Sequence, residues 1–118
     1  MIETLAVGKL KWHHITDPTE EDFVELKEKF HFHPLDIEDC RSVNQRPKID
    51  IYDDYYFLIL QYPDFDRQDK FIFPKEVKLF WGKDYIITLE RKRWHVSQLF
   101  NEYSERDAET PAKELATP

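Results

Sequence analysis

The sequence predicts an α/β fold, a three-layer α/β/α sandwich with a mixed central sheet. The expected elements follow the order strand, strand, helix, helix, strand, strand, strand, helix, which favours helices packed on a sheet over an all-α or all-β domain. The segment Phe57–Leu60 is wholly apolar, which predicts a strand buried on both faces and therefore helices on both sides of the sheet. A length of 118 residues suits one domain with one hydrophobic core.

Two short strands are expected first, Thr4–Val7 and Lys9–Ile15, separated at Gly8. A helix follows the Asp17-Pro18 turn. Thr19 is its expected N-cap, because three acidic residues come directly after it, where the helix dipole favours negative charge. This helix should run to about residue 31, and its apolar stripe is Phe23, Leu26 and Phe30.

A second, short helix is expected between Pro34 and Arg41. Proline suits the first helical position, because its missing N–H would have had no helical partner there. His33 precedes it as the expected cap. On this helix Ile37 and Cys40 share an apolar face. The loop that follows, 42–48, must leave the helical conformation before Pro47.

The later part of the chain is read as three strands. Asp50–Tyr62 is the first, followed by an acidic surface loop that ends at Lys70. Glu76–Trp81 and Tyr85–Glu90 form a predicted hairpin, joined by the turn Gly82-Lys83-Asp84. A last helix should span Trp94 to about Arg106, with the stripe Val96, Leu99, Phe100 and Tyr103. Residues 1–106 therefore form the expected domain, and residues 107–118 a loose tail.

Composition excludes several classes of protein. The net charge of −7 argues against a nucleic-acid-binding surface, which needs clustered excess lysine and arginine. Cys40 is the only cysteine, so no internal disulfide can form and an intracellular compartment is favoured. No secretory signal opens the sequence. The longest apolar run, about residues 55–60, is far shorter than the roughly 20 residues of a membrane-spanning helix.

The candidate functional residues are the three acids of the second helix, Asp36, Glu38 and Asp39. Asp36 and Asp39 are three residues apart, so we expect them to share a solvent-exposed face while the apolar side anchors the helix to the sheet. Carboxylate oxygens are ligands of hard cations such as Mg²⁺, which keeps several waters and accepts one or two protein carboxylates. The sequence thus predicts a weak divalent-cation site. The simpler interpretation is a solvated acidic helix face.

Other polar residues support weaker hypotheses. His31 and His33 could bind a softer ion such as Zn²⁺ or Co²⁺, but a helix end and a cap account for them equally well. Arg46 and Lys48 could bind an anion, or could hold Asp39 or Asp50 by charge. We favour the structural role. An enzymatic function has little support, because only two glycines are present and neither belongs to a phosphate-binding loop.

Several of these segments together resemble a known family. They are His33-Pro34-Leu35, Ile37-Glu38-Asp39, Gln45-Arg46-Pro47-Lys48-Ile49 and Tyr52–Leu60, preceded by Trp12 and by the acidic helix after Pro18. This ordered set is similar to the amino-terminal cytoplasmic domain of the CorA family of magnesium transporters. The resemblance covers about residues 12–103, and it implies the layered α/β/α sandwich expected above.

The resemblance also implies a function. The position that matches Asp39 implies a regulatory divalent site, for Mg²⁺ or for Co²⁺ or another divalent cation, and Glu38 matches a nearby secondary position. In this family the site is shared with the long stalk helix of the neighbouring subunit, within a homopentamer. The domain would lie at the cytoplasmic face of the cell membrane, and only the missing carboxy-terminal part would enter the membrane. Residues 107–118 would lead towards the absent stalk helix.

Two other functions stay open. The first is a soluble module that binds a protein partner through an aromatic-rich edge and has no metal role. The second, weaker one is a small metal-dependent enzyme, which a screen for hydrolysis with added Mn²⁺ or Mg²⁺ would test. Neither requires the acidic helix to bind a regulatory ion.

Overall fold

The computed structural model describes residues 2–42, 45–66, 71–91 and 99–105. Within them lie six strands and two labelled helices: β1 (Ile2–Val7), β2 (Leu10–Thr16), α1 (Glu20–Phe30), α2 (Pro34–Arg41), β3 (Lys48–Ile51), β4 (Tyr55–Asp66), β5 (Phe71–Gly82) and β6 (Tyr85–Glu90). Residues 99–105 are also helical. The remainder of the last predicted helix, 94–98 and 106, and the predicted tail 107–118 lie outside the described residues.

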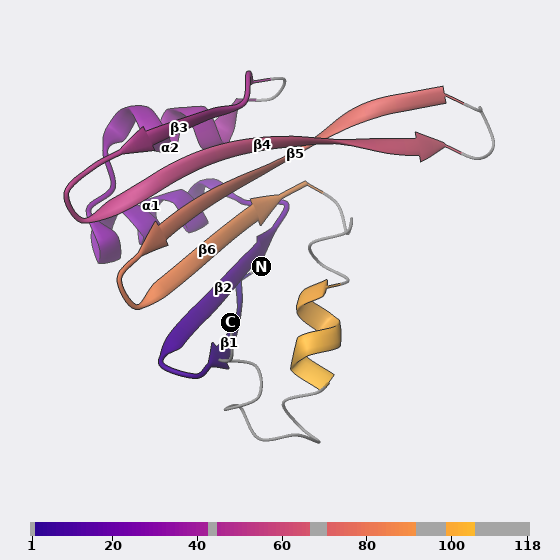
Figure 1. Ribbon diagram of the computed structural model, residues 1–118. Helices are drawn as coiled ribbons and strands as arrows, with labels where there is room; N and C mark the ends of the chain where they lie inside the picture. Colours follow the sequence, from indigo (N-terminus) through magenta and orange to yellow (C-terminus); the bar gives the residue numbers. More distant parts are fainter. Residues whose placement is uncertain (1, 43–44, 67–70, 92–98, 106–118) are drawn as a thin grey trace.

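The six strands form one mixed sheet in the order β1-β2-β6-β5-β4-β3 (Figure 1). Among the strands that the structure describes, four pairings are antiparallel, and the pairing of β2 with β6 is parallel. The last strand therefore lies between the amino-terminal hairpin and β5. The predicted mixed sheet is confirmed.

Helices contact both faces of this sheet. His13 on β2 packs its ring against Phe30 of α1, with ring centroids 6.0 Å apart. Trp12, the preceding residue, packs against Phe100, with centroids 4.9 Å apart. Adjacent residues of a strand point to opposite faces, so α1 and residues 99–105 lie on opposite sides. This arrangement agrees with the expected layers.

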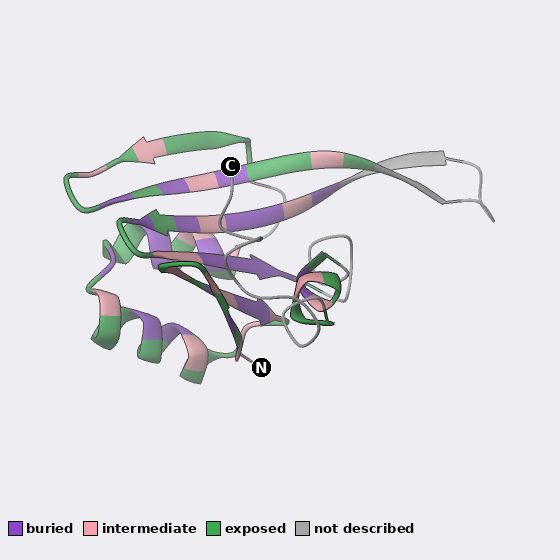
Figure 2. Cartoon of the chain, turned by 60° about the horizontal axis from the view of Figure 1, so that its bottom comes forward, coloured by how far each residue is buried: buried purple, intermediate pink, exposed green. Residues whose placement is uncertain are grey.

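The main core lies between the sheet and the helices α1 and α2 (Figure 2). Phe32, in the short connection between these helices, stacks on Phe80 of β5 with ring centroids 3.9 Å apart. The buried members of this core are Ile15, Phe23, Leu26, Phe32, Ile37, Cys40, Tyr55, Phe57, Ile59, Phe80, Ile87 and Leu89. Both helices are thus anchored through one apolar face each, as predicted.

Helix α1 begins and ends as its sequence requires. Thr19 and Asp22 form a reciprocal capping box, in which each side chain accepts a hydrogen bond from the backbone N–H of the other residue. The helix ends at His31, whose φ of 57° is left-handed and whose N–H donates to the Lys27 carbonyl.

The predictions for the middle strands were partly wrong. The segment expected as one strand is two, because the chain reverses between β3 and β4, where the Tyr52 N–H donates to the Tyr55 carbonyl at 3.0 Å. The intervening Asp53-Asp54 pair favours a turn. The acidic loop expected from Pro63 to Lys70 is wrong up to Asp66, because β4 continues to that residue and pairs with β5 from Phe71. Residues 67–70 lie outside the described residues.

Burial of β4 on both faces was likewise predicted wrongly. Phe57 and Ile59 face the helices α1 and α2 and are fully buried, but Tyr56 and Leu60, on the opposite face, are 43% and 40% exposed. Phe100 contacts β2, which is three strands away from β4. At about 4.8 Å per strand, β4 lies roughly 14 Å from β2. A single helix packed on β2 is too narrow to cover β4 as well.

None of the helices in the described residues is both long enough and apolar enough to cross a membrane.

Candidate functional site

Helix α2 forms where the sequence predicts it. Pro34 occupies its first turn, and the His33 side chain caps it by accepting a hydrogen bond from the Leu35 N–H at 3.1 Å. Ile37 and Cys40 are each 3% exposed and hold the helix on the sheet. Burial raises the pKa of the Cys40 thiol to about 12, so it is neutral and packed as an apolar group.

Asp36 does not face solvent, which corrects the prediction that it shares an exposed face with Asp39. Its side chain is fully buried and accepts hydrogen bonds from the hydroxyls of Tyr52 at 3.0 Å and Tyr55 at 2.7 Å. The physical reason is the helical repeat: Asp36 is also four residues before Cys40, so it lies at the border of the buried face. Burial raises the pKa of Asp36, although the two tyrosine hydroxyls oppose this shift.

Tyr55 also connects the start of α2 to the sheet. Besides donating to Asp36, the Tyr55 hydroxyl accepts a hydrogen bond from the His33 N–H at 2.9 Å. Tyr52 stacks on Tyr55 with ring centroids 4.6 Å apart. Sequence reasoning missed this network, and the signal was weak: two tyrosines next to a predicted turn.

Asp39 lies on the outer side of α2, with its side chain 23% exposed, and it is paired with Lys48 of β3. The Lys48 ammonium lies 2.6 Å from Asp39 Oδ2 and 3.0 Å from Asp50 Oδ2. These two hydrogen bonds raise the pKa of Lys48, and the hydrogen bond to Asp39 has the larger effect. The expectation that Lys48 holds Asp39 or Asp50 by charge is confirmed, and it holds both.

Glu38 is the most exposed of the three predicted acids. Its side chain is 64% exposed and pairs with Arg41, whose Nη1 lies 3.0 Å from Glu38 Oε2. Arg41 also reaches Glu20 at the start of α1, at 3.0 Å. Surface pairs of this kind contribute little to stability, so Glu38 is free to change partners at low cost.

Three carboxylates converge at this point: Asp36, Asp39 and Asp50 each have an oxygen within 4.8 Å of the others. Oxygen donors in such a group suit a hard divalent cation. Asp50 was not predicted as a member. Its position two residues after Lys48 on a strand places both side chains on one face, but only the β3–β4 turn brings that face against α2.

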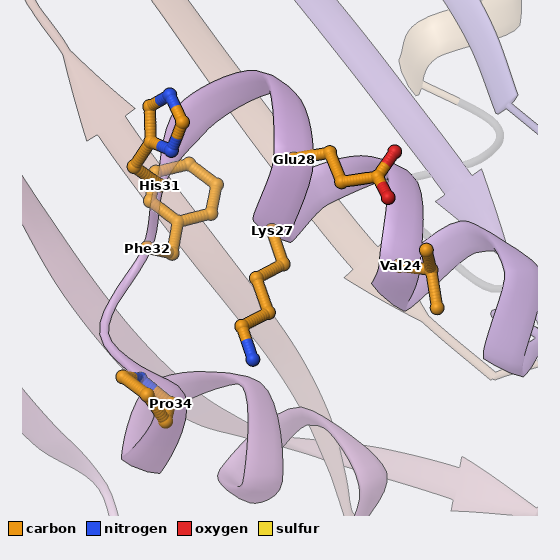
Figure 3. Close-up of a pocket in the computed structure, with 6 residues that line it drawn as sticks. All are labelled: Val24, Lys27, Glu28, His31, Phe32 and Pro34. Atoms are coloured by element: carbon orange, nitrogen blue, oxygen red, sulfur yellow. The ribbon is translucent and has the colours of Figure 1, made fainter.

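The cleft beside His31 does not support the hypothesis that His31 and His33 bind a metal ion together. A cleft of about 640 Å³ at the junction of α1 and α2 is lined by Val24, Lys27, Glu28, His31, Phe32 and Pro34 (Figure 3). His33 is not among these residues, and its Nδ1 accepts a hydrogen bond from the Leu35 N–H. The predicted pair of histidines therefore does not meet in this cleft, and Lys27 points from α1 toward α2 there.

Comparison with known proteins bears on this geometry. The family described as CorA-like Mg²⁺ transporter protein matches residues 7–117. The chain belongs to this CorA-like family. It is 35% identical to the putative metal ion transporter YfjQ of Bacillus subtilis over 89 residues, which is 74% of this chain and 27% of the relative. It is 29% identical to the cobalt/magnesium transport protein CorA of Thermotoga maritima over 96 residues, 80% of this chain and 26% of the relative.

The fold agrees with the family. The structure of the soluble domain of CorA from Methanocaldococcus jannaschii matches with a TM-score of 0.65 at 15% identity, over 89% of this chain and 40% of that one. This CorA-like chain spans about a quarter of the length of the two curated relatives.

Proposed function

We propose that this chain is the regulatory domain of a CorA-like divalent cation transporter and that it senses Mg²⁺, or Co²⁺ in some settings, at the cytoplasmic face of the membrane. The observation that carries the proposal is the convergence of three carboxylate oxygens within 4.8 Å of one another, two from α2 and one from β3. Membership of the family supports a cation rather than another ligand.

The three acids of α2 have different proposed roles, according to how far each side chain is exposed to solvent. Asp39 is the proposed direct ligand, since its carboxylate reaches solvent and is exchangeably paired. Glu38, one residue away and well exposed, is the proposed secondary ligand. Asp36 contributes negative charge from beneath, held in place by its two tyrosines. A cation held by so few protein oxygens keeps most of its water and binds weakly.

Such a weak half-site becomes effective between subunits. In the proposed assembly, a homopentamer, the stalk helix of the neighbouring subunit adds a further acidic ligand. Bound Mg²⁺ neutralises the repulsion between acidic surfaces and favours the closed arrangement; when Mg²⁺ is scarce, this repulsion makes the open arrangement more populated. The ion acts only through its higher affinity for the closed state.

The test uses the full-length transporter and limited proteolysis at increasing Mg²⁺. Asp39→Asn should lose Mg²⁺-dependent protection, because the ligand charge is gone while the side-chain shape is kept. Glu21→Gln, an exposed acid of α1 with the same change in charge, is the matched control and should behave as the unchanged protein. Protection by Mg²⁺ that is equal in both variants would remove Asp39 from the proposed site.

A second candidate function is a protein-interaction module with no metal role. It is favoured by large apolar side chains exposed on the sheet face opposite α1 and α2: Ile49, Ile51, Tyr56, Leu60 and Trp81. Large exposed apolar patches mark interaction surfaces. If this function is the correct one, Ile51→Ser should weaken assembly of the full-length protein, and Asp39→Asn should leave its response to Mg²⁺ unchanged.

A further inference from the structure

Lys48 stands where a metal ion would have to bind. Its ammonium is bonded to one oxygen of Asp39 and one of Asp50, at 2.6 and 3.0 Å. The protein thus already supplies a single positive charge to two of the three converging carboxylates.

An ammonium and a divalent ion cannot both use this place. Mg²⁺ binds oxygen at about 2.1 Å, and Lys48 already donates to Oδ2 of Asp39. Two cations on one carboxylate oxygen repel each other strongly at such short range. Direct binding of a metal ion to Asp39 at this oxygen therefore requires the ammonium to leave.

Lys48 is built so that it can leave. Its side chain is 38% exposed, so the ammonium can turn into water without crossing the core. The lysine stem has four rotatable carbons, and its charge is readily hydrated. Its attachment at β3, an edge strand of the sheet, keeps the ammonium near the carboxylates after it has been displaced.

We propose that Lys48 is an internal competitor that sets the Mg²⁺ concentration at which the site fills. The inference rests on the proposed function, because it needs Asp39 to bind the metal. Binding of a divalent ion and the Lys48 ion pairs exclude each other. The free energy needed to break the ion pairs therefore lowers the affinity of the site for the ion. The site then responds at high Mg²⁺ concentrations instead of remaining saturated.

Replacing Lys48 by methionine keeps the length of the side chain and removes its charge. Two partly exposed ion pairs are lost, so we expect the affinity for Mn²⁺ to rise by about 5- to 30-fold. Lys48→Arg keeps the cation and should bind Mn²⁺ no more tightly than the unchanged protein. Lys29→Met is the matched control, since Lys29 pairs with Glu25 on α1 at 3.1 Å and its loss makes the same change in net charge.

The experiment titrates this 118-residue chain with Mn²⁺ and measures free Mn²⁺ by electron paramagnetic resonance, with circular dichroism as the check on folding. A parallel Mg²⁺ titration follows the Lys48 Cε resonance by NMR, which should shift as the ammonium is displaced. A purely structural lysine would change stability in Lys48→Met without raising the affinity for Mn²⁺.

The outcomes separate the two proposals. Mn²⁺ binding that Asp39→Asn abolishes and Lys48→Met strengthens, while Lys29→Met leaves it unchanged, supports both. Binding that depends on Asp39 but is equal or weaker in Lys48→Met overturns the role of Lys48 and leaves the proposed site standing. Binding that is the same with and without the Asp39 carboxylate overturns the site, and with it this inference.

Discussion

Replacing Asp36 by alanine should lower the free energy of unfolding by about 2–4 kcal/mol. The carboxylate accepts two hydrogen bonds, from Tyr52 and Tyr55, and each bond to a charged group contributes about 1.5–3 kcal/mol. The sum is reduced because burying the carboxylate is itself unfavourable, as its raised pKa shows. Tyr55 also keeps its bond from the His33 N–H, so its oxygen is not left without a partner.

Urea unfolding at neutral pH, followed by circular dichroism, measures this loss. With a slope of roughly 2 kcal/mol per molar urea, the midpoint should fall by about 1–2 M. Glu38→Ala, on the same helix but 64% exposed, is the control and should change stability by less than about 0.5 kcal/mol. If the two variants unfold at the same urea concentration, the tyrosine network does not anchor α2 and the reasoning fails.

Three further predictions concern single positions. Because burial raises the folded pKa of Asp36, the stability that its protonation provides is present below its ordinary pKa and is lost as pH rises through the folded value. Wild type should therefore lose stability relative to Asp36→Asn as pH rises above the ordinary pKa of the carboxyl, as paired urea titrations would show. Cys40 should react with a thiol reagent only after unfolding, because it is 3% exposed with a pKa of about 12, and rapid labelling of the native protein would contradict its burial. Gly82→Ala should cost about 1–3 kcal/mol, because a Cβ there would meet the Tyr85 ring, and adding Tyr85→Ala should remove most of that extra cost if the contact is the cause.

The parts of the fold that were predicted are those coded by neighbours in sequence. Thr19 and Asp22 form one capping box within four residues, and Pro34 fixes the start of α2 by its own geometry. The hairpin of β5 and β6 follows from two strand-like segments joined by a short turn that begins at Gly82. Each of these signals is complete within a few residues, so tertiary packing had little to overrule.

The predictions were wrong or incomplete where contacts between segments distant in sequence determine the position of a side chain. Asp36 could face either way on its helix, and the direction was set by two tyrosines 16 and 19 residues later. Asp50 joined the carboxylates only because the chain turns back after β3. The exposure of a polar residue at the border of an apolar helical face thus cannot be predicted until the position of its hydrogen-bond partners is known. The assignment of Asp39, Glu38 and Asp36 as metal ligands stays a prediction.

The parallel pairing of β2 with β6 has a consequence for biosynthesis. Lys11 lies beside Tyr85, a partner that the ribosome adds 74 residues later. Until that partner emerges, the amino-terminal hairpin has no neighbour on its inner side, and closing so long a loop is slow. A nascent chain halted before β6 would thus carry helices without a finished sheet to cover, and would be a natural client for chaperones.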